Sequence, residues 1–197
     1  MEIIKKKTPN FTVGRANGSK PELIVIHIMD GTLKGTDSWF ADKTSNVSSH
    51  YGIGQTGEVH QYVEEKDTAY HAGVVENPSF KLYKNGINPN LYTIGIEHEG
   101  NATSTWSEKM KISSAELIQD ICGRWNIPID RDHIIGHYQI RSSKPNCPAK
   151  DKSIIDELIT RAKGNEVVSP ETQKIQDLAR AAALLSEAMQ IISKYAK

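Results

Sequence analysis

The sequence predicts an α/β fold in which a mixed central β-sheet is flanked by helices. Short runs of continuous apolar residues, such as LIVIHI at residues 23–28, are typical of buried strands. These runs alternate along the chain with segments in which apolar residues recur at helical spacing, and this alternation favours an α/β domain. With 197 residues, 38% of them hydrophobic and 24% charged, the chain is long enough for one domain of about 150 residues and a remainder.

A strand and a short helix are predicted first. The segment PELIVIHI, residues 21–28, is expected to be a buried strand because its apolar residues are continuous rather than alternating. The segment TDSWFADKT, residues 36–44, is expected to be a short helix with Thr36 or Asp37 as its N-cap.

A hairpin and a second buried strand come next. The segment YGIGQTGEVHQYV, residues 51–63, has the pattern of a hairpin that turns at residues 56–57. The segment YTIGIE, residues 92–97, is short and mostly apolar, which is typical of a buried strand.

Two helices and a third strand complete the predicted domain. A capping-box pattern, S-x-x-E, opens at Ser113 and predicts a helix to about Trp125. Residues 134–137 are predicted to form the third strand, and residues 151–163 a helix that stops at Gly164. The domain is therefore expected to end there.

The C-terminal remainder is predicted to be a linker at residues 165–169 and an amphipathic helix at residues 170–197. Apolar residues of this helix follow the a/d steps of a heptad repeat, but over too few heptads to predict a coiled coil. Two roles stay open: docking of the apolar stripe on the domain at residues 1–164, or self-association into a homodimer.

Composition excludes several classes of protein. Lys+Arg and Asp+Glu both number 24, so the basic excess typical of nucleic-acid binders is missing and no nucleic-acid partner is expected. No apolar stretch approaches the roughly 18 residues of a membrane span. The N-terminus lacks an apolar signal-peptide core, so we expect synthesis in the cytoplasm, where the two cysteines are free thiols.

Two histidines and a cysteine are the candidate metal ligands. His27 lies inside an aliphatic strand, where a buried imidazole is costly unless something binds it. His137 ends a second buried strand, and Cys147 follows in PNCPA. Such a set suits zinc, because catalytic zinc takes three protein ligands and leaves a fourth position open. His133 competes for the ligand role, since it shares a predicted face with His137, but it lies at the start of its strand.

Ordered motifs along the chain resemble the type 2 class of N-acetylmuramoyl-L-alanine amidases, which are zinc amidases related to peptidoglycan-recognition proteins and phage amidases. The resemblance covers roughly residues 20–162 and is carried by LIVIHI, SSHYGIGQTGEVHQYV, YHAGV, YTIGIEHEG and GHYQI followed after six residues by CPA. It implies a mixed sheet with zinc at the edge of a peptidoglycan-binding groove, and His27, His137 and Cys147 as the zinc ligands.

Glu97 is the candidate catalytic residue. It ends an otherwise apolar strand, and the resemblance supports a role as the general base that takes a proton from zinc-bound water and delivers it to the leaving amine. Strand alternation sends His98 to the opposite face, whereas Glu99 shares the face of Glu97 and leaves some ambiguity.

The sequence departs from the family at two positions. Some members carry a catalytic tyrosine in the first strand of the hairpin, and that position is Ser49 here, not Tyr51. Many members place a lysine or threonine two residues before the third ligand, and that position is Pro145 here. The adjacent Lys144 is the candidate that replaces it, since a group that stabilises the oxyanion is often worth about 10²–10³ in rate.

Other residues near the motifs carry weaker expectations. By its position in the family, His71 contacts the substrate or transition state, with a structural loop histidine as the alternative. His50 is expected to pack beneath the site, His60 to be exposed and Cys122 to be a small core residue. Trp39 and Tyr70 line either the groove or the core.

The expected function is zinc-dependent hydrolysis of the amide between N-acetylmuramic acid and L-alanine in peptidoglycan. A phage endolysin that reaches the cell wall after holin-type release is the favoured setting. The alternatives are a cytosolic muropeptide-recycling amidase and a peptidoglycan-binding module without activity. The common H-E-x-x-H motif of zinc peptidases is absent from the sequence.

Overall fold

The computed structural model describes residues 1–164 and residue 189. The chain divides into two units, Met1–Asn165 and Glu166–Lys197, and the described residues other than Met189 belong to the first. The linker and C-terminal helix predicted at residues 165–197 lie outside the described residues, Met189 apart. In the part of the chain that the structure describes, no helix is long and apolar enough to cross a membrane.

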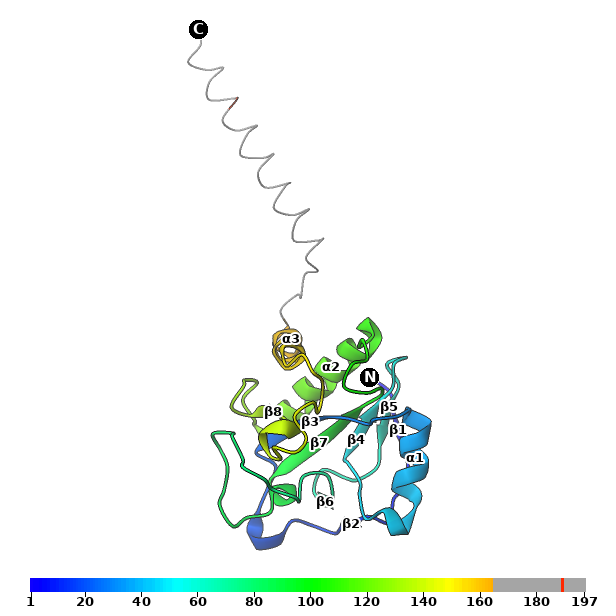
Figure 1. Ribbon diagram of the computed structural model, residues 1–197, viewed down its shortest axis with the longest axis vertical. Coiled ribbons are helices and arrows are strands. Elements are labelled where there is room, and N and C mark those ends of the chain that lie inside the picture. Colours follow the sequence, from blue (N-terminus) through cyan, green and yellow to red (C-terminus); the bar gives the residue numbers. More distant parts are fainter. Residues whose placement is uncertain (165–188, 190–197) are drawn as a thin grey trace. The chain divides into compact units, whose positions relative to one another are not determined.

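A mixed six-stranded sheet forms the centre of the unit, as predicted (Figure 1). In spatial order its strands are β1 (Ile3–Lys5), β5 (Val59–Gln61), β4 (Tyr51–Ile53), β7 (Thr93–His98), β3 (Leu23–Ile28) and β8 (Ile134–Gly136). The hairpin strands β4 and β5 are antiparallel, and the other pairings are parallel. A small second sheet pairs β2 (Phe11–Thr12) with β6 (Thr68–Ala69). Sequence analysis did not anticipate the short strands β1, β2 and β6.

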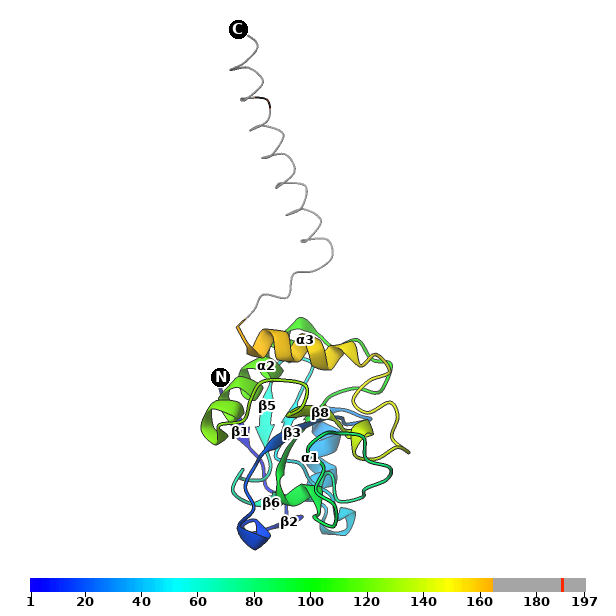
Figure 2. The same ribbon diagram turned by 90° about the vertical axis from the view of Figure 1, so that its left-hand side faces the viewer.

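Three helices cover the sheet: α1 (Leu33–Ala41), α2 (Glu108–Trp125) and α3 (Ser153–Ala162). Helices α2 and α3 lie together on one face, and α1 lies on the opposite side (Figures 1 and 2). The strand β3 serves both faces because its side chains alternate. Ile24 and Ile26 pack in the core with α2 and α3, whereas Leu23 and Val25 pack in a second core beneath loops.

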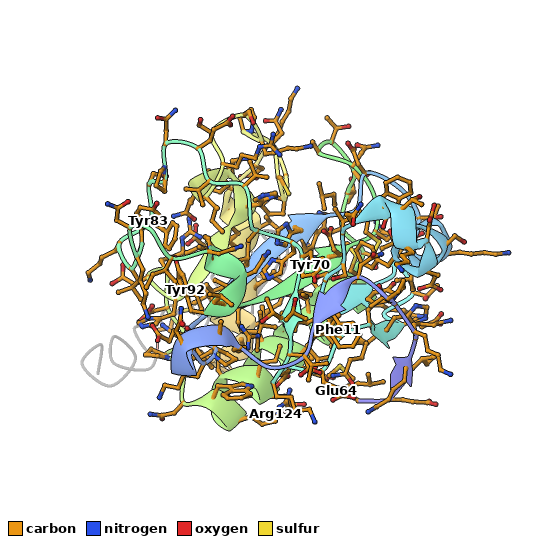
Figure 3. All side chains as sticks on the ribbon, turned by 90° about the horizontal axis from the view of Figure 1, so that it is seen from below. Phe11, Glu64, Tyr70, Tyr83, Tyr92 and Arg124 are labelled. Atoms are coloured by element: carbon orange, nitrogen blue, oxygen red, sulfur yellow. The ribbon has the colours of Figure 1, made fainter. Side chains whose placement is uncertain are left out.

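The second core places His27 on the loop-covered face, because His27 follows Leu23 and Val25 in the alternation. Tyr83 and Tyr92 belong to this core, and they lie near each other on the side seen in Figure 3. Both tyrosines come from the segment that joins β6 to β7, and Tyr92 directly precedes β7. The loop-covered face therefore holds His27, and the helical face holds most of the buried hydrophobic residues.

The start of α1 differs from the prediction. Thr32 is the N-cap, and its hydroxyl accepts a hydrogen bond from the backbone N–H of Gly35 at 3.0 Å. Thr36 lies buried within the helix. The carboxylate of Asp37 instead accepts hydrogen bonds from Tyr62 and His60. Thr36 and Asp37 are therefore not the N-cap. The first is buried inside the helix, and the second binds side chains of the hairpin.

The start of α2 was also predicted too late. Ser107 caps the helix by accepting a hydrogen bond from the backbone N–H of Met110 at 3.1 Å. Ser113 lies inside the helix, and its hydroxyl donates to the carbonyl of Gly57 at 2.8 Å. Gly57 has a φ of +84° in the turn between β4 and β5, where the hairpin was expected. The helix therefore uses Ser113 to hold the hairpin.

A candidate metal centre in a groove

Neighbouring strands bring the candidate base to the candidate ligands. In the parallel pair β3 and β7, His27 stands directly opposite Glu97 near the carboxyl end of the sheet. The nearest nitrogen of His27, Nδ1, lies 3.9 Å from Oε1 of Glu97. The possible ligand atoms of His27, His137 and Cys147 all lie within 4.8 Å of one another. The structure thus brings together the three residues predicted to bind zinc.

Local backbone structure orients the side chains of His137 and Cys147. The strand β8 ends at Gly136, one residue earlier than predicted, and His137 begins a 3-10 turn that continues to Gln139. The side chain of Gln139 accepts a hydrogen bond from the backbone N–H of Gly136 at 3.1 Å, which holds this turn. The sulfur of Cys147 accepts a hydrogen bond from the backbone N–H of Ile28 at 3.4 Å. The turn, rather than strand alternation, therefore directs His137.

The competing histidine lies elsewhere. Nδ1 of His133 is 2.7 Å from a carboxylate oxygen of Asp130, three residues earlier in the chain. It does not belong to the cluster of possible ligands in the described part of the chain.

Burial controls protonation in the cluster. Burial and neighbouring imidazoles hold the pKa of His27 well below its ordinary value, and burial lowers the pKa of His137 to about 4. Both rings are neutral at pH 7 and offer lone pairs. Burial also raises the pKa of Glu97 to about 8 and that of the Cys147 thiol to about 12.

These donors fit a zinc ion. Two neutral imidazoles and a sulfur are ligands that zinc prefers, and its positive charge would offset the cost of ionising a buried thiol. Oε2 of Glu97 is buried and has no hydrogen-bond partner among the described residues. An unsatisfied carboxylate oxygen at this point needs a polar ligand beside the cluster.

A groove of about 640 Å³ contains the cluster and opens to solvent. Trp39 lines it with 56% of its surface exposed, so this side chain belongs to the groove and not to the core. Tyr70, labelled in Figure 3, lines the groove as well. The exposed Lys144 and its neighbour Pro145 lie along the same groove. The volume is that of a site for a small molecule or a polymer segment.

His71 lies against the candidate ligand His27. Its Nδ1 is 3.0 Å from Nε2 of His27, and its Nε2 is 3.3 Å from the hydroxyl of Thr93. His71 also lines the groove. Its predicted contact with substrate stays a prediction, as does the role of Lys144.

Three further residues that the sequence singled out follow the predictions with one exception. His50 is fully buried and accepts a hydrogen bond from the backbone N–H of Gly95 at 3.1 Å. Cys122 is 3% exposed in the core, as expected. His60 was expected to be exposed and is 3% exposed, because its two nitrogens lie 2.8 Å from Asp37 and 2.6 Å from Glu58. Carboxylates on both sides satisfy this buried ring.

The neighbours of Glu97 resolve an ambiguity left by the sequence. A carboxylate oxygen of Glu99 accepts a hydrogen bond from the backbone N–H of Gln55 at 2.7 Å, and Glu99 does not line the groove that Glu97 lines. His98 lies on the helical face, 2.8 Å from the hydroxyl of Ser114. Ser49, at the position of the family's tyrosine, is fully buried with its hydroxyl unpartnered in the described structure.

Sequence reasoning missed Arg15. Its guanidinium donates to the carbonyl oxygens of Glu65, Asn90 and Leu91 and lies 3.0 Å from Nε2 of His50. No motif marks this arginine, since its partners, mostly backbone carbonyl groups, come from distant segments of the chain. It joins the floor of the site to the surrounding loops.

The comparisons with known proteins agree with the geometry. A family model described as N-acetylmuramoyl-L-alanine amidase matches residues 17–150. The N-acetylmuramoyl-L-alanine amidase A of Achromobacter lyticus is 38% identical over 104 residues, which cover 51% of this chain and 51% of that protein. The chain thus spans about half the length of this relative.

A second relative covers more of the chain. The 1,6-anhydro-N-acetylmuramyl-L-alanine amidase AmpD of Enterobacter cloacae is 28% identical over 174 residues, with 78% of this chain and 88% of that protein covered. Among solved structures, one titled "crystal structure of Se-Met AmpD derivative" superposes with a TM-score of 0.64 at 23% identity. It covers 80% of this chain and 94% of that chain, which shows a common fold.

Proposed function

The chain belongs to the N-acetylmuramoyl-L-alanine amidase family, and from this premise we propose that it hydrolyses the amide between N-acetylmuramic acid and L-alanine in bacterial peptidoglycan. His27, His137 and Cys147 would hold a zinc ion for this reaction. The observation that carries the proposal is the convergence of these three residues beside the unpartnered carboxylate of Glu97 in an open groove.

The residues of the chain divide the work of hydrolysis. A bound zinc ion supplies a Lewis acid and lowers the pKa of its water to about 7. Glu97 accepts a proton from the attacking water and delivers it to the nitrogen of the departing L-alanine. Its strand position opposite His27 and its free Oε2 support this role. Lys144 would stabilise negative charge on the scissile carbonyl oxygen, and its position along the same groove supports this role.

The substitution Glu97→Gln tests the assignment of the base. Glutamine keeps the size of the side chain but cannot take up the proton, so we expect hydrolysis to fall about 10²–10⁴-fold while zinc content stays near that of the wild type. Release of peptide from purified muropeptide measures activity, and elemental analysis measures zinc.

The matched control is Glu99→Gln, two residues away. Glu99 accepts a hydrogen bond from the backbone of Gln55, which glutamine can also accept, so this variant should keep its activity. Wild-type turnover in Glu97→Gln would refute the proposed base. Loss of zinc from that variant would instead make Glu97 a part of the metal site.

For the biological setting, we propose a phage endolysin that acts on the cell wall after holin-type release. The similarity to AmpD favours a second candidate, the hydrolysis of soluble 1,6-anhydro-muropeptides. Rates on intact sacculi and on a soluble 1,6-anhydro-muropeptide distinguish the two. The third candidate, a binding module without activity, is disfavoured because the chain keeps all three candidate ligands and a candidate base beside them.

A further inference from the structure

A chain of hydrogen bonds leads from the backbone to the first candidate ligand. The hydroxyl of Thr93 donates to the carbonyl of Pro89 at 2.8 Å. The same hydroxyl oxygen lies 3.3 Å from Nε2 of His71, and Nδ1 of His71 lies 3.0 Å from Nε2 of His27. Every link is buried or partly buried.

The direction of each hydrogen bond follows from the first one. A carbonyl oxygen can only accept a hydrogen bond, so the hydroxyl of Thr93 donates its single proton to the carbonyl oxygen of Pro89. The hydroxyl oxygen of Thr93 must therefore accept a hydrogen bond from Nε2–H of His71. The imidazole of His71 donates from Nε2, and a neutral imidazole has one donor nitrogen and one acceptor nitrogen. Its Nδ1 therefore carries a lone pair and accepts from Nε2–H of His27. This leaves the lone pair of His27 on Nδ1, the nitrogen that lies 3.9 Å from Glu97.

Gly95 provides independent support for the position of the His71 ring. It lies between Thr93 and Glu97 on the face of β7 that His27 also occupies. A Cβ atom at this position would lie 2.6 Å from Cγ and Nδ1 of His71. Glycine is unfavourable inside a strand unless another group approaches closely. The approaching group here is the imidazole of His71.

The backbone of His71 is fixed as well. The side-chain oxygen of Asn90 accepts hydrogen bonds from the backbone N–H groups of His71 and Ala72, at 3.1 and 2.7 Å. Asn90 is itself buried. Backbone and ring are thus held by separate contacts, and both sets direct Nδ1 of His71 at His27.

We propose that His71 is a positioning residue, which together with Thr93 fixes the ring and the tautomer of His27 so that the lone pair on Nδ1 would be available to a bound metal. The inference rests on the proposed zinc function, and it replaces direct contact with substrate as the main role of His71. Groups that hydrogen-bond to a ligating histidine typically change metal affinity about 10–100-fold when they are removed.

Metal affinity and ring tautomer are the two measurements that test this role. We expect His71→Leu, which has no acceptor, to weaken zinc binding about 10–100-fold in a chelator competition with the full-length protein. His71→Asn places an amide oxygen near the position of Nδ1 and should restore most of this affinity. His133→Asn, which alters a histidine outside the cluster, is the control and should bind zinc as the wild type does.

Nitrogen-15 spectra of the zinc-free wild type read the tautomer without reference to activity. We expect the proton of His27 on Nε2, and in Thr93→Val a mixture of both tautomers with an unchanged fold. A proton on Nδ1 in the wild type would overturn the inference. So would His71→Leu with wild-type zinc affinity and a raised KM, since that result indicates substrate contact.

Failure of the proposed function has a different signature. A wild-type protein that binds no zinc would refute the zinc function, while the nitrogen-15 spectra would still decide the hydrogen-bond chain. The positioning role of His71 alone is refuted if the wild type binds zinc tightly but neither His71→Leu nor Thr93→Val alters the zinc affinity or the tautomer of His27.

Discussion

Burial shifts the pKa values of single residues in the groove. Desolvation keeps two imidazoles neutral and raises the pKa of both Glu97 and Cys147, so the cluster has lone pairs available but lacks a strong fixed charge of its own. Lys144 brings the missing positive charge from the exposed side of the groove. Burial is the main cause of the lowered pKa of His137, and the positive charge of Lys144 is the second. The same charge opposes the rise in the pKa of Glu97.

The substitution Lys144→Met should therefore lower kcat about 10²-fold and leave zinc affinity unchanged, because the lysine would stabilise charge that develops during the reaction. Steady-state kinetics on a soluble muropeptide and chelator competition measure the two quantities. The control is Lys150→Met, an exposed lysine nearby in the sequence that does not line the groove. Equal kcat values for both variants would remove Lys144 from the mechanism.

The candidate ligands His27 and His137 and the candidate base Glu97 could be chosen from the sequence because each lies within an apolar strand or directly after one. A polar residue within or beside an apolar strand stands out in the sequence itself, without knowledge of the tertiary structure. Cys147 lies in a loop well beyond β8 and was chosen only together with the two histidines and the family motifs. The contact between His71 and His27 could not be predicted, since it depends on the path of a loop between β6 and β7. His60 was misjudged for a similar reason, because the two carboxylates that satisfy it come from α1 and from the hairpin turn.

At the scale of elements, side chains that bridge secondary structures decide where each element begins and what it contacts. Ser113 matches a capping box but binds the hairpin turn, and Asp37 matches an N-cap but binds the hairpin strand β5. Local patterns therefore predicted which elements exist better than where they start. Glu65 is the clearest bridge, since it joins β4 to the end of α2.

Glu65 accepts hydrogen bonds from Tyr51 at 2.8 Å, from Arg124 at 2.6 Å and from Trp125 at 2.5 Å. Glu65→Gln should lower the free energy of unfolding by about 1–3 kcal/mol at pH 7, because a buried charged acceptor is lost. Urea unfolding measures this change. The neighbouring Glu64→Gln is the control and should cost under about 0.5 kcal/mol, since its ion pair with Lys5 is exposed.

The effect of Glu65 also depends on pH. Burial opposes its ionisation, but hydrogen bonds from Arg124, Trp125 and Tyr51 outweigh burial and hold its pKa below the ordinary value. Its contribution is then complete above the unfolded pKa of about 4.3 and disappears as pH falls through the lower folded pKa. The difference between wild type and Glu65→Gln should therefore shrink below about pH 4. A difference that grows on acidification would contradict this bridge.

For the whole molecule, the boundary of the domain at Gly164 and the two roles of residues 170–197 can be tested separately. The buried hydrophobic residues that the structure describes lie between Leu23 and Ala162. The helix α3 ends at Ala162, and Gly164 follows with a φ of +76°, a conformation that terminates helices. The domain predicted at residues 1–164 thus has a core of its own in the described structure.

We expect a chain that ends at Gly164 to unfold cooperatively, to bind zinc and to hydrolyse soluble muropeptide at the rate of the full chain. Calorimetry, chelator competition and kinetics test these three properties, and loss of the cooperative transition would refute the domain boundary. Light scattering then separates the two roles of residues 170–197. A mass that falls from dimer to monomer indicates self-association, which would strengthen binding to the cell wall through avidity. An unchanged monomer with a lower midpoint of unfolding indicates docking, because the apolar stripe would then stabilise the domain that it covers.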